Sequence, residues 1–204
     1  KVIILEKAID LISNEKQLLG NLEKEEIEYL NTFQLISIKP VVFVCNVDED
    51  SAVNGNEFTK QINEYAKKNN SEVLLVSAKI ESEISQISDE SEKKEFLESL
   101  GLIETGLKRV IRKGYEILNY INFFTAGEKE LRAWTIVKGS LAPTAAGTIH
   151  SDMEKGFIRA ETISYNDYIE FNGEAGSKEK GKLRLEGKEY VVQDGDVMHF
   201  LFNV

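Results

Sequence analysis

Cysteine, proline, tryptophan and histidine are scarce in this sequence, and the scarcity restricts what the protein can be. The 204 residues include one cysteine, so no internal disulfide can form, and a reducing cytoplasm suits the chain. Long apolar runs are also missing. None approaches the roughly 20 residues of a transmembrane helix, so we expect no membrane partner. An apolar content of 42% and a charged content of 29% indicate a folded globular protein.

Positive charge is in short supply as well. The formal net charge is −10, with −9 on residues 1–103 and −4 on residues 141–204, and only residues 104–140 are positive, at +3. A chain this acidic is not expected to coat nucleic acid non-specifically. If the protein contacts RNA, the segment 104–140 is the candidate surface.

What the sequence does contain is a pair of apolar stretches of strand length, each followed by polar residues. The stretch 41–45 leads into Asn46, with Glu49 three residues on, and the stretch 73–76 leads into a loop of Ser77, Ala78 and Lys79. A helix predicted over residues 57–68 connects them, which is the rhythm of an α/β domain. Doubly wound sheets bind ligands where their strands end, so we predict two buried strands that present a base-reading edge for a nucleotide.

The rest of the pattern predicts helices before residue 119 and mostly strands after it. Helical periodicity covers residues 1–19, 24–33, 91–100 and 105–118. Strand-like segments follow at 121–125, 131–137, 157–164 and 197–204, with a hairpin of 183–185 and 190–192, a short helix at 142–150 and a flexible loop at 174–181. Many short strands around one helix indicate a small α+β domain.

The polar residues after the two strands have a physical use in base recognition. An Asn amide can brace the loop and touch the ring, an acid can accept hydrogen bonds from an exocyclic amine, and the second loop offers backbone N–H groups. Asn-x-x-Glu alone is common, and two ordinary strand-ending loops are the plainer interpretation. The pattern becomes more specific because Asn-x-x-Glu follows one predicted strand and Ser-Ala-Lys follows the next.

These residues and three later stretches resemble the Obg-like ATPase family, also called YchF. Residues 46–49 and 77–81 look like the fourth and fifth nucleotide motifs of that family, and FFTAGEKELRAWT at 123–135 is similar to it as well. IHSDMEKGFIRAE at 149–161 and GKEYVVQDGD at 187–196 look like its carboxyl-terminal TGS module. The resemblance is dense from about residue 35 to the end, whereas residues 1–34 resemble the family only in character.

The resemblance implies the carboxyl-terminal part of a P-loop NTPase of the translation-factor class. The implied parts are the return half of a helical arm (1–38), the end of a doubly wound nucleotide-binding sheet (39–103), a connecting helix (104–118) and a β-grasp TGS domain (119–204). The implied partner is the ribosome, as its large subunit or as a whole, contacted through ribosomal RNA or protein.

The resemblance also implies a preference for ATP over GTP. Most relatives in that class read guanine with Asn-Lys-x-Asp, whereas this sequence has Val47 in place of the Lys and Glu49 as the acid. The resemblance further implies that Asn46, Val47 and Glu49 would line the base and that Ser77, Ala78 and Lys79 would close over it. Mg²⁺ would accompany the nucleotide in the intact protein.

The phosphate-binding half of such a site does not occur in these residues. There is no Gly-x-x-x-x-Gly-Lys-Ser/Thr, nor an Asp-x-x-Gly stretch of the kind expected near a γ-phosphate. Phosphoryl transfer depends on that cradle and its magnesium. We therefore expect no catalytic residue and no metal ligand here, and no hydrolysis of ATP or GTP by these 204 residues alone.

Four cations share one flank of the helix predicted over 105–118, namely Lys108, Arg109, Arg112 and Lys113. A solvated helix face is the plainer interpretation, but their place between two modules keeps an RNA contact as a hypothesis.

His150 with two nearby acids is a weak metal pattern, and a structural histidine fits better. Two rival functions remain, a non-catalytic TGS adaptor that binds RNA or protein and a regulatory small-ligand module.

Overall fold

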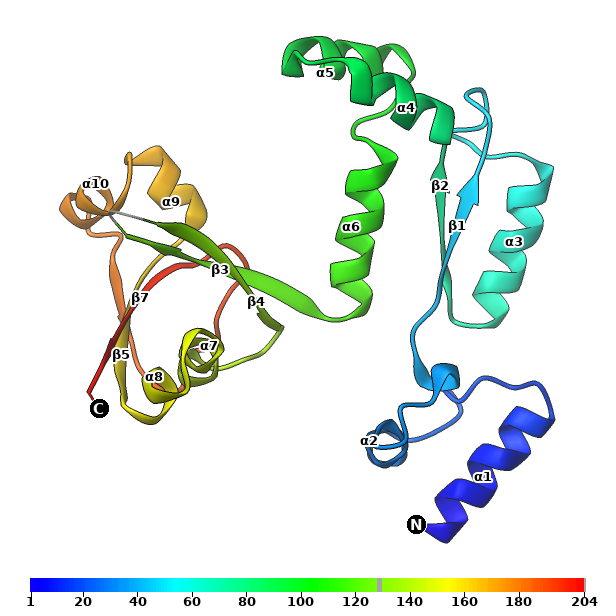
Figure 1. Ribbon diagram of the computed structural model, residues 1–204, viewed down its shortest axis with the longest axis horizontal. Helices are drawn as coiled ribbons and strands as arrows, with labels where there is room; N and C mark the ends of the chain where they lie inside the picture. Colours follow the sequence, from blue (N-terminus) through cyan, green and yellow to red (C-terminus); the bar gives the residue numbers. More distant parts are fainter. Residues whose placement is uncertain (128–129, 204) are drawn as a thin grey trace. The chain divides into compact units, whose positions relative to one another are not determined.

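The computed structural model describes residues 1–127 and 130–203, in two compact units, Lys1–Gly114 and Tyr115–Val204 (Figure 1). Each unit combines helices with a β-sheet, so the mixed α/β class expected from the sequence is confirmed at that level. No helix within the described ranges has the length and apolar content to cross a bilayer. Glu128, Lys129 and Val204, which the predicted motif and last strand include, lie outside the described residues.

The first unit opens with a small group of helices. α1 (Val2–Ser13), α2 (Lys24–Asn31) and the 3-10 helix η1 (Ile36–Ile38) share one apolar cluster around Leu18 and Leu30. The prediction of one helix over residues 1–19 is wrong, because α1 ends at Ser13. Glu15 takes a φ of 54°, and the Lys16 amide turns back to the Leu11 carbonyl at 2.9 Å. This turn carries Leu18 into the cluster, where it is 0% exposed.

The sheet of the first unit consists of two parallel strands, β1 (Val42–Asn46) and β2 (Glu72–Val76), joined by α3 (Glu57–Lys68). The bounds of α3 are those predicted, because Asn56 starts the helix: its Oδ1 accepts the Thr59 amide at 3.1 Å. The register pairs Asn46 with Val76, so both strands end together.

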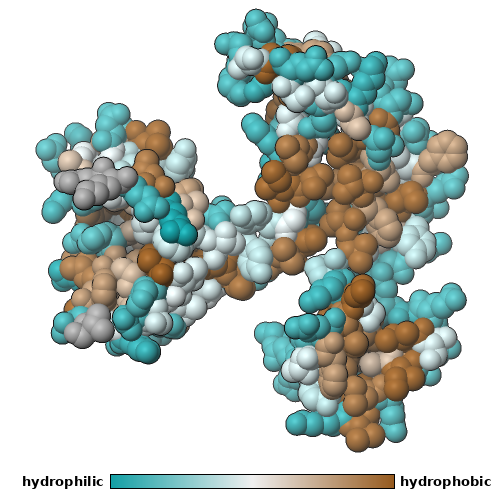
Figure 2. Space-filling model, in the orientation of Figure 1, coloured by the Kyte–Doolittle hydropathy of each residue, from teal (hydrophilic) through white to brown (hydrophobic). Residues whose placement is uncertain are grey.

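The prediction that β1 and β2 are buried is wrong. Val44 is 51% exposed, because the sheet has two strands within the described residues and its side chains lack further strands as neighbours. Figure 2 shows apolar side chains gathered on the visible face of this part of the first unit, around β1, β2 and α6 (Gly106–Ile117). Leu107 and Ile111 of α6 are 61% and 52% exposed.

Two helices lie between β2 and α6. α4 (Ala78–Gln86) and α5 (Glu90–Ser99) pack around Ile80, Ile84 and Leu97. The stretch of Ser77, Ala78 and Lys79, which we predicted to be a loop, is instead the start of α4. Ser77 is the N-cap, and its carbonyl accepts the Glu81 amide at 3.0 Å. Serine is common at helix starts, but the Ser77 side chain makes no cap bond here, and the first turn is closed by its carbonyl.

The second unit is built on a five-stranded mixed sheet in the order β4-β3-β7-β5-β6. Its strands are β3 (Tyr120–Ala126), β4 (Leu131–Val137), β5 (Phe157–Ile163), β6 (Arg184–Glu186) and β7 (Val197–Phe202). β3 and β7 are parallel, and the other neighbours are antiparallel. α7 (Ala142–Ile149) and α8 (Ser151–Lys155) pack on one face, over a core that includes Phe123 and Phe200.

Two predictions for the second unit are wrong. The stretch 174–181 is not a flexible loop, because it contains α10 (Glu174–Glu179), in which Ser177 is fully buried and donates to the Gly173 carbonyl at 2.8 Å. It follows another short helix, α9 (Tyr165–Glu170). The expected hairpin of 183–185 with 190–192 does not form either. β6 pairs with β5, and Val191 forms a bridge with Leu141.

Candidate nucleotide-base site

The carboxyl ends of β1 and β2 are tied together by hydrogen bonds. Asn46, the last residue of β1, accepts the Ala78 amide on its Oδ1 at 3.0 Å. The next amide, of Val47, donates to the Val76 carbonyl at 2.9 Å. The two stretches that the sequence predicts to read a base therefore lie at one edge of the sheet, where parallel strands end side by side.

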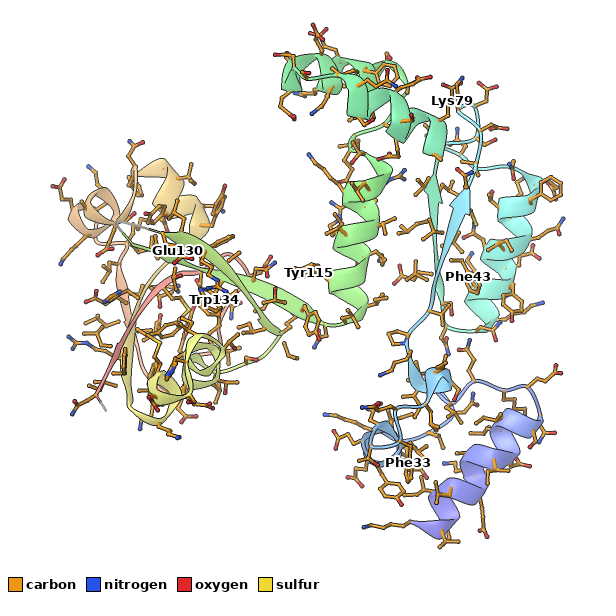
Figure 3. The ribbon with its side chains drawn as sticks, in the orientation of Figure 1. Phe33, Phe43, Lys79, Tyr115, Glu130 and Trp134 are labelled. Atoms are coloured by element: carbon orange, nitrogen blue, oxygen red, sulfur yellow. The ribbon has the colours of Figure 1, made fainter. Side chains whose placement is uncertain are left out.

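Glu49 and Lys79, one from each stretch, form an ion pair at this edge, where Figure 3 labels Lys79. Lys79 Nζ lies 2.7 Å from Glu49 Oε2, and the two side chains are 66% and 35% exposed. The hydrogen bond to Glu49, and after it the negative charge of Glu49, raise the pKa of Lys79. The carboxylate predicted to accept from a base is thus already paired with an ammonium group, which an entering amine must share or displace.

Two neighbours of this pair decide which groups face a ligand. Asp48 is turned into its own loop, where its Oδ1 accepts the Ser51 amide at 2.9 Å. Ser77 is only 3% exposed, and its Oγ has no hydrogen-bond partner among the described residues. A buried hydroxyl without a partner costs about 1–3 kcal/mol. The edge therefore presents the paired carboxylate to a ligand, whereas Asp48 is turned away and the Ser77 hydroxyl is buried.

A residue that the sequence analysis assigned no role links this edge to α6. Glu81, in the first turn of α4, accepts the Gly106 amide on Oε1 at 2.6 Å and the Leu107 amide on Oε2 at 3.2 Å. A carboxylate at a helix amino terminus satisfies free amides and complements the helix dipole. No local pattern could reveal this cap, because its partners lie 25 residues away along the chain.

The cationic flank of α6 is divided between surface and interior. Arg109 donates from Nη2 to the Leu75 carbonyl of β2 at 2.8 Å. Lys113 Nζ lies 2.6 Å from Glu72 Oε2, and Arg112 pairs with Glu104. Lys108 is exposed, as is Arg112. The flank thus has two members that hold α6 against β2 and two that are open to solvent.

His150 has a structural role. Its Nδ1 accepts the Asp152 amide at 3.2 Å at the start of α8. Among residues 1–127 and 130–203, no group of three or more His, Cys, Asp or Glu side chains is placed to hold a metal ion. Cys45 is a free thiol of intermediate exposure in β1.

The second unit contains a buried polar network around Asp196, which is 2% exposed. Its Oδ2 accepts the Tyr190 hydroxyl at 2.7 Å and the Gln193 amide at 2.9 Å, and its Oδ1 accepts Arg184 Nη2 at 3.3 Å. Burial first, and then the hydrogen bond to Asp196, raise the pKa of Tyr190 to about 12. Every bond of this network is internal, so its role is to hold β6 and the turn before β7 in place.

Known proteins similar to this chain point to one family. Residues 120–203 match the family YchF-GTPase_C, described as "Protein of unknown function (DUF933)". The ribosome-binding ATPase YchF of Haemophilus influenzae is 51% identical over 202 residues, which cover 98% of this chain and 55% of that protein. The protein of the same name from Bacillus subtilis is 50% identical over 204 residues, at 98% and 56% coverage. The chain spans about half the length of the curated relatives it matches.

Solved structures agree with this assignment. The Schizosaccharomyces pombe YchF GTPase matches with a TM-score of 0.83 and 33% identity, over 98% of this chain and 53% of that chain. A GTP binding protein from Pyrococcus horikoshii OT3 matches with a TM-score of 0.57 and 18% identity, over 97% of this chain and 64% of that chain, which shows a shared fold alone. The motifs at 46–49 and 77–81, the fold and the relatives all lead to the same conclusion: the chain belongs to the YchF family.

Proposed function

We propose that the intact protein is a P-loop NTPase of the translation-factor class that binds ATP in preference to GTP, hydrolyses it and associates with the ribosome in the cytoplasm. The observation that carries the proposal is the joined edge of β1 and β2, where the bond from the Ala78 amide to Asn46 places Glu49 and Lys79 together. The names of the relatives, ribosome-binding ATPase for two and GTPase for a third, support the nucleotide and the partner.

In this proposal the base is read by Asn46, Val47 and Glu49 from one side and by Ser77, Ala78 and Lys79 from the other. Glu49 would accept from the exocyclic amine of adenine, sharing or displacing the ammonium of Lys79 that holds it at 2.7 Å. The phosphates and Mg²⁺ would be held by other parts of the intact protein.

Base choice is tested by calorimetry with ATP and GTP on the intact protein. Glu49→Asp combined with Val47→Lys should shift the affinity ratio toward GTP, because the acceptor shortens and a lysine stem covers the base. Each good hydrogen bond to a buried base edge is worth about 1–3 kcal/mol when its loss strands a partner, so the ratio should move by about tenfold or more. Asp50→Asn, which neutralises a neighbouring acid of the same loop, is the matched control. An unchanged ratio in the double variant would show that these side chains do not read the base.

We further propose that the second unit is a β-grasp TGS domain and that the intact protein contacts ribosomal RNA through the cationic flank of Lys108, Arg109, Arg112 and Lys113, with the exposed Lys108 and Arg112 meeting the phosphates while Arg109 and Lys113 hold the helix. Co-sedimentation with ribosomes over a salt series tests this. Lys108→Ala with Arg112→Ala removes the two exposed charges and leaves the anchors of α6 intact, so the log–log salt slope should fall by about two units without loss of stability. Lys67→Ala with Lys68→Ala at the end of α3 is the control. Equal slopes for both pairs would assign the flank to solvation.

A further inference from the structure

The edge strand β4 presents a main-chain surface in the second unit that its own sheet does not use. Within the described residues, β4 pairs only with β3. The bonds from the Gly127 amide to the Glu130 carbonyl, at 2.9 Å, and from the Lys138 amide to the Asn119 carbonyl, at 2.7 Å, fix which residues face β3. Antiparallel ladders alternate, so the amides of Leu131, Ala133 and Thr135 point outward.

Natural edge strands are usually protected against pairing with another chain, by proline, lysine, bulges or shortness. β4 lacks most of these devices: it has seven residues in continuous register with β3 and contains neither proline nor lysine. The opposite edge, β6, has only three residues. The edge of β4 is therefore the one able to accept a further strand.

Two hollows lie at the two ends of this edge. One, of about 330 Å³, is lined by Phe124, Leu131 and Ala133 of the sheet and by Tyr165, Tyr168 and Ile169 of α9. The other, of about 450 Å³, is lined by Tyr120, Thr135, Ile136, Val137 and Ser140 and by Thr144 and Thr148 of α7. The first hollow suits a large apolar side chain, and the second combines apolar side chains with threonine and serine. A strand added to β4 would run between them.

The charge of the segment that contains β4 favours an acidic partner. Residues 131–140 contain Arg132 and Lys138 and no acid, within a chain of net charge −10. The Arg132 guanidinium lies over the Trp134 ring, 4.0 Å from its centroid, so it is held at the strand. In an antiparallel pairing of two copies centred on Thr135, Arg132 of one copy lies opposite Lys138 of the other, which disfavours self-pairing in that register. A segment with acidic residues beside apolar ones is complementary.

We propose that the edge of β4 binds an extended segment of a protein partner by strand addition. The main chain of that segment pairs with Leu131, Ala133 and Thr135, an apolar side chain enters the hollow between β4 and α9, and flanking carboxylates face Arg132 and Lys138. Main-chain pairing supplies affinity in this mode, and the hollows supply selectivity.

The test uses the whole 204-residue chain and a fluorescein-labelled peptide, Asp-Asp-Val-Leu-Ile-Val-Asp-Asp. Two control peptides replace every Asp by Lys, or methylate alternate main-chain nitrogens so that the side chains stay but the ladder cannot form. Fluorescence anisotropy should show binding of the first peptide and at least about tenfold weaker binding of both controls. Amide hydrogen exchange should slow at Leu131, Ala133 and Thr135.

Two variants locate the site. Ala133→Pro removes an outward amide and leaves the bonds to β3, so binding should fall by about tenfold, whereas Ala133→Val keeps the amide and should bind within about twofold. Arg132→Glu with Lys138→Glu should reverse the preference toward the lysine peptide, and it keeps the test decisive if the proline variant does not fold. Equal binding by all variants, slowed exchange elsewhere in the chain, or self-association that Ala133→Pro abolishes would overturn the proposal.

Discussion

Tyr190 shows how a single residue reports the packing around it. Its hydroxyl donates to the buried Asp196, and the pKa of the phenol is raised to about 12. Because the folded-state pKa lies above the ordinary value of 10.0, the protonated phenol stabilises the fold. That contribution is fully present below pH 10 and is lost as the pH rises through about 12.

We therefore expect a tyrosine step at about pH 12 in an alkaline spectrophotometric titration of the folded chain. Tyr190→Phe should remove this late step and leave the earlier ones in place. Tyr115→Phe, which removes a phenol that is only weakly bonded to Thr135 at 3.4 Å, is the control. If the late step survives in Tyr190→Phe, the phenol is not held by Asp196 as described.

The residues of the base edge could be proposed from sequence because their signal is local. Asn46 and Glu49 follow one apolar stretch and Ser77 to Lys79 another, and parallel strands must end together. Two features of the site could not be predicted from the local sequence. The ion pair of Glu49 with Lys79 joins residues 30 positions apart, and the division of the cationic flank depends on β2 partners such as Leu75.

At the scale of elements, we predict that alanine substitutions at two glycines of α6 change the stability of the first unit in opposite directions. A methyl group at Gly106 would stand 2.9 Å from Val76 Cγ1 and 3.0 Å from Glu81 Oε1, at the point where Glu81 caps the helix. At Gly114, nothing lies within 4 Å of the same group. Gly106→Ala should therefore destabilise the first unit by about 1–3 kcal/mol, through overpacking and a disturbed cap.

Gly114→Ala should stabilise the same unit by about 0.5–1 kcal/mol, because alanine is the better helix former and meets no neighbour. Urea unfolding followed by far-ultraviolet circular dichroism measures both changes on one scale. A loss of stability in both variants would mean that α6 is packed on both sides, and no loss at Gly106 would mean that the Glu81 cap is not rigid.

Elements with strong local signals were predictable to the residue. α3 starts at the Asn56 cap, and β4 is a run rich in apolar and β-favouring residues over 131–137 beside the turn at Gly127, and the bounds of both match the structure. α9 and α10 have six residues each, too few to show a helical period, so they were missed. The pairing of β6 with β5 was missed because strand partners are set by the whole sheet.

At the scale of the whole molecule, each unit has buried clusters of its own. Phe123, Phe157 and Phe200 belong to the second unit, and Ile80 and Leu97 to the first. We expect residues 115–204 to fold alone and to unfold at a midpoint within about 2 °C of the second unit in the full chain, as the core is complete without the rest. Trp134 is the only tryptophan, so its emission follows this unit selectively.

Circular dichroism of the full chain on heating should then show a further transition that Trp134 emission does not follow. Phe123→Ala removes a core side chain of the second unit, which costs about 3–5 kcal/mol. It should lower the emission midpoint and the matching dichroism transition and leave the further transition in place. A single transition seen by both probes would mean that the two units unfold as one.

At the proposed base site, the pair of Glu49 and Lys79 would make base binding an exchange rather than a simple gain. The carboxylate is satisfied before any nucleotide arrives, so the affinity for a base measures the difference between two partners of one acceptor. Added salt screens the two charges and weakens the ion pair. It would therefore change the affinity for a base even if it has no other effect on the site. The affinity of the proposed site would thus depend on what a base must replace as much as on what it contacts.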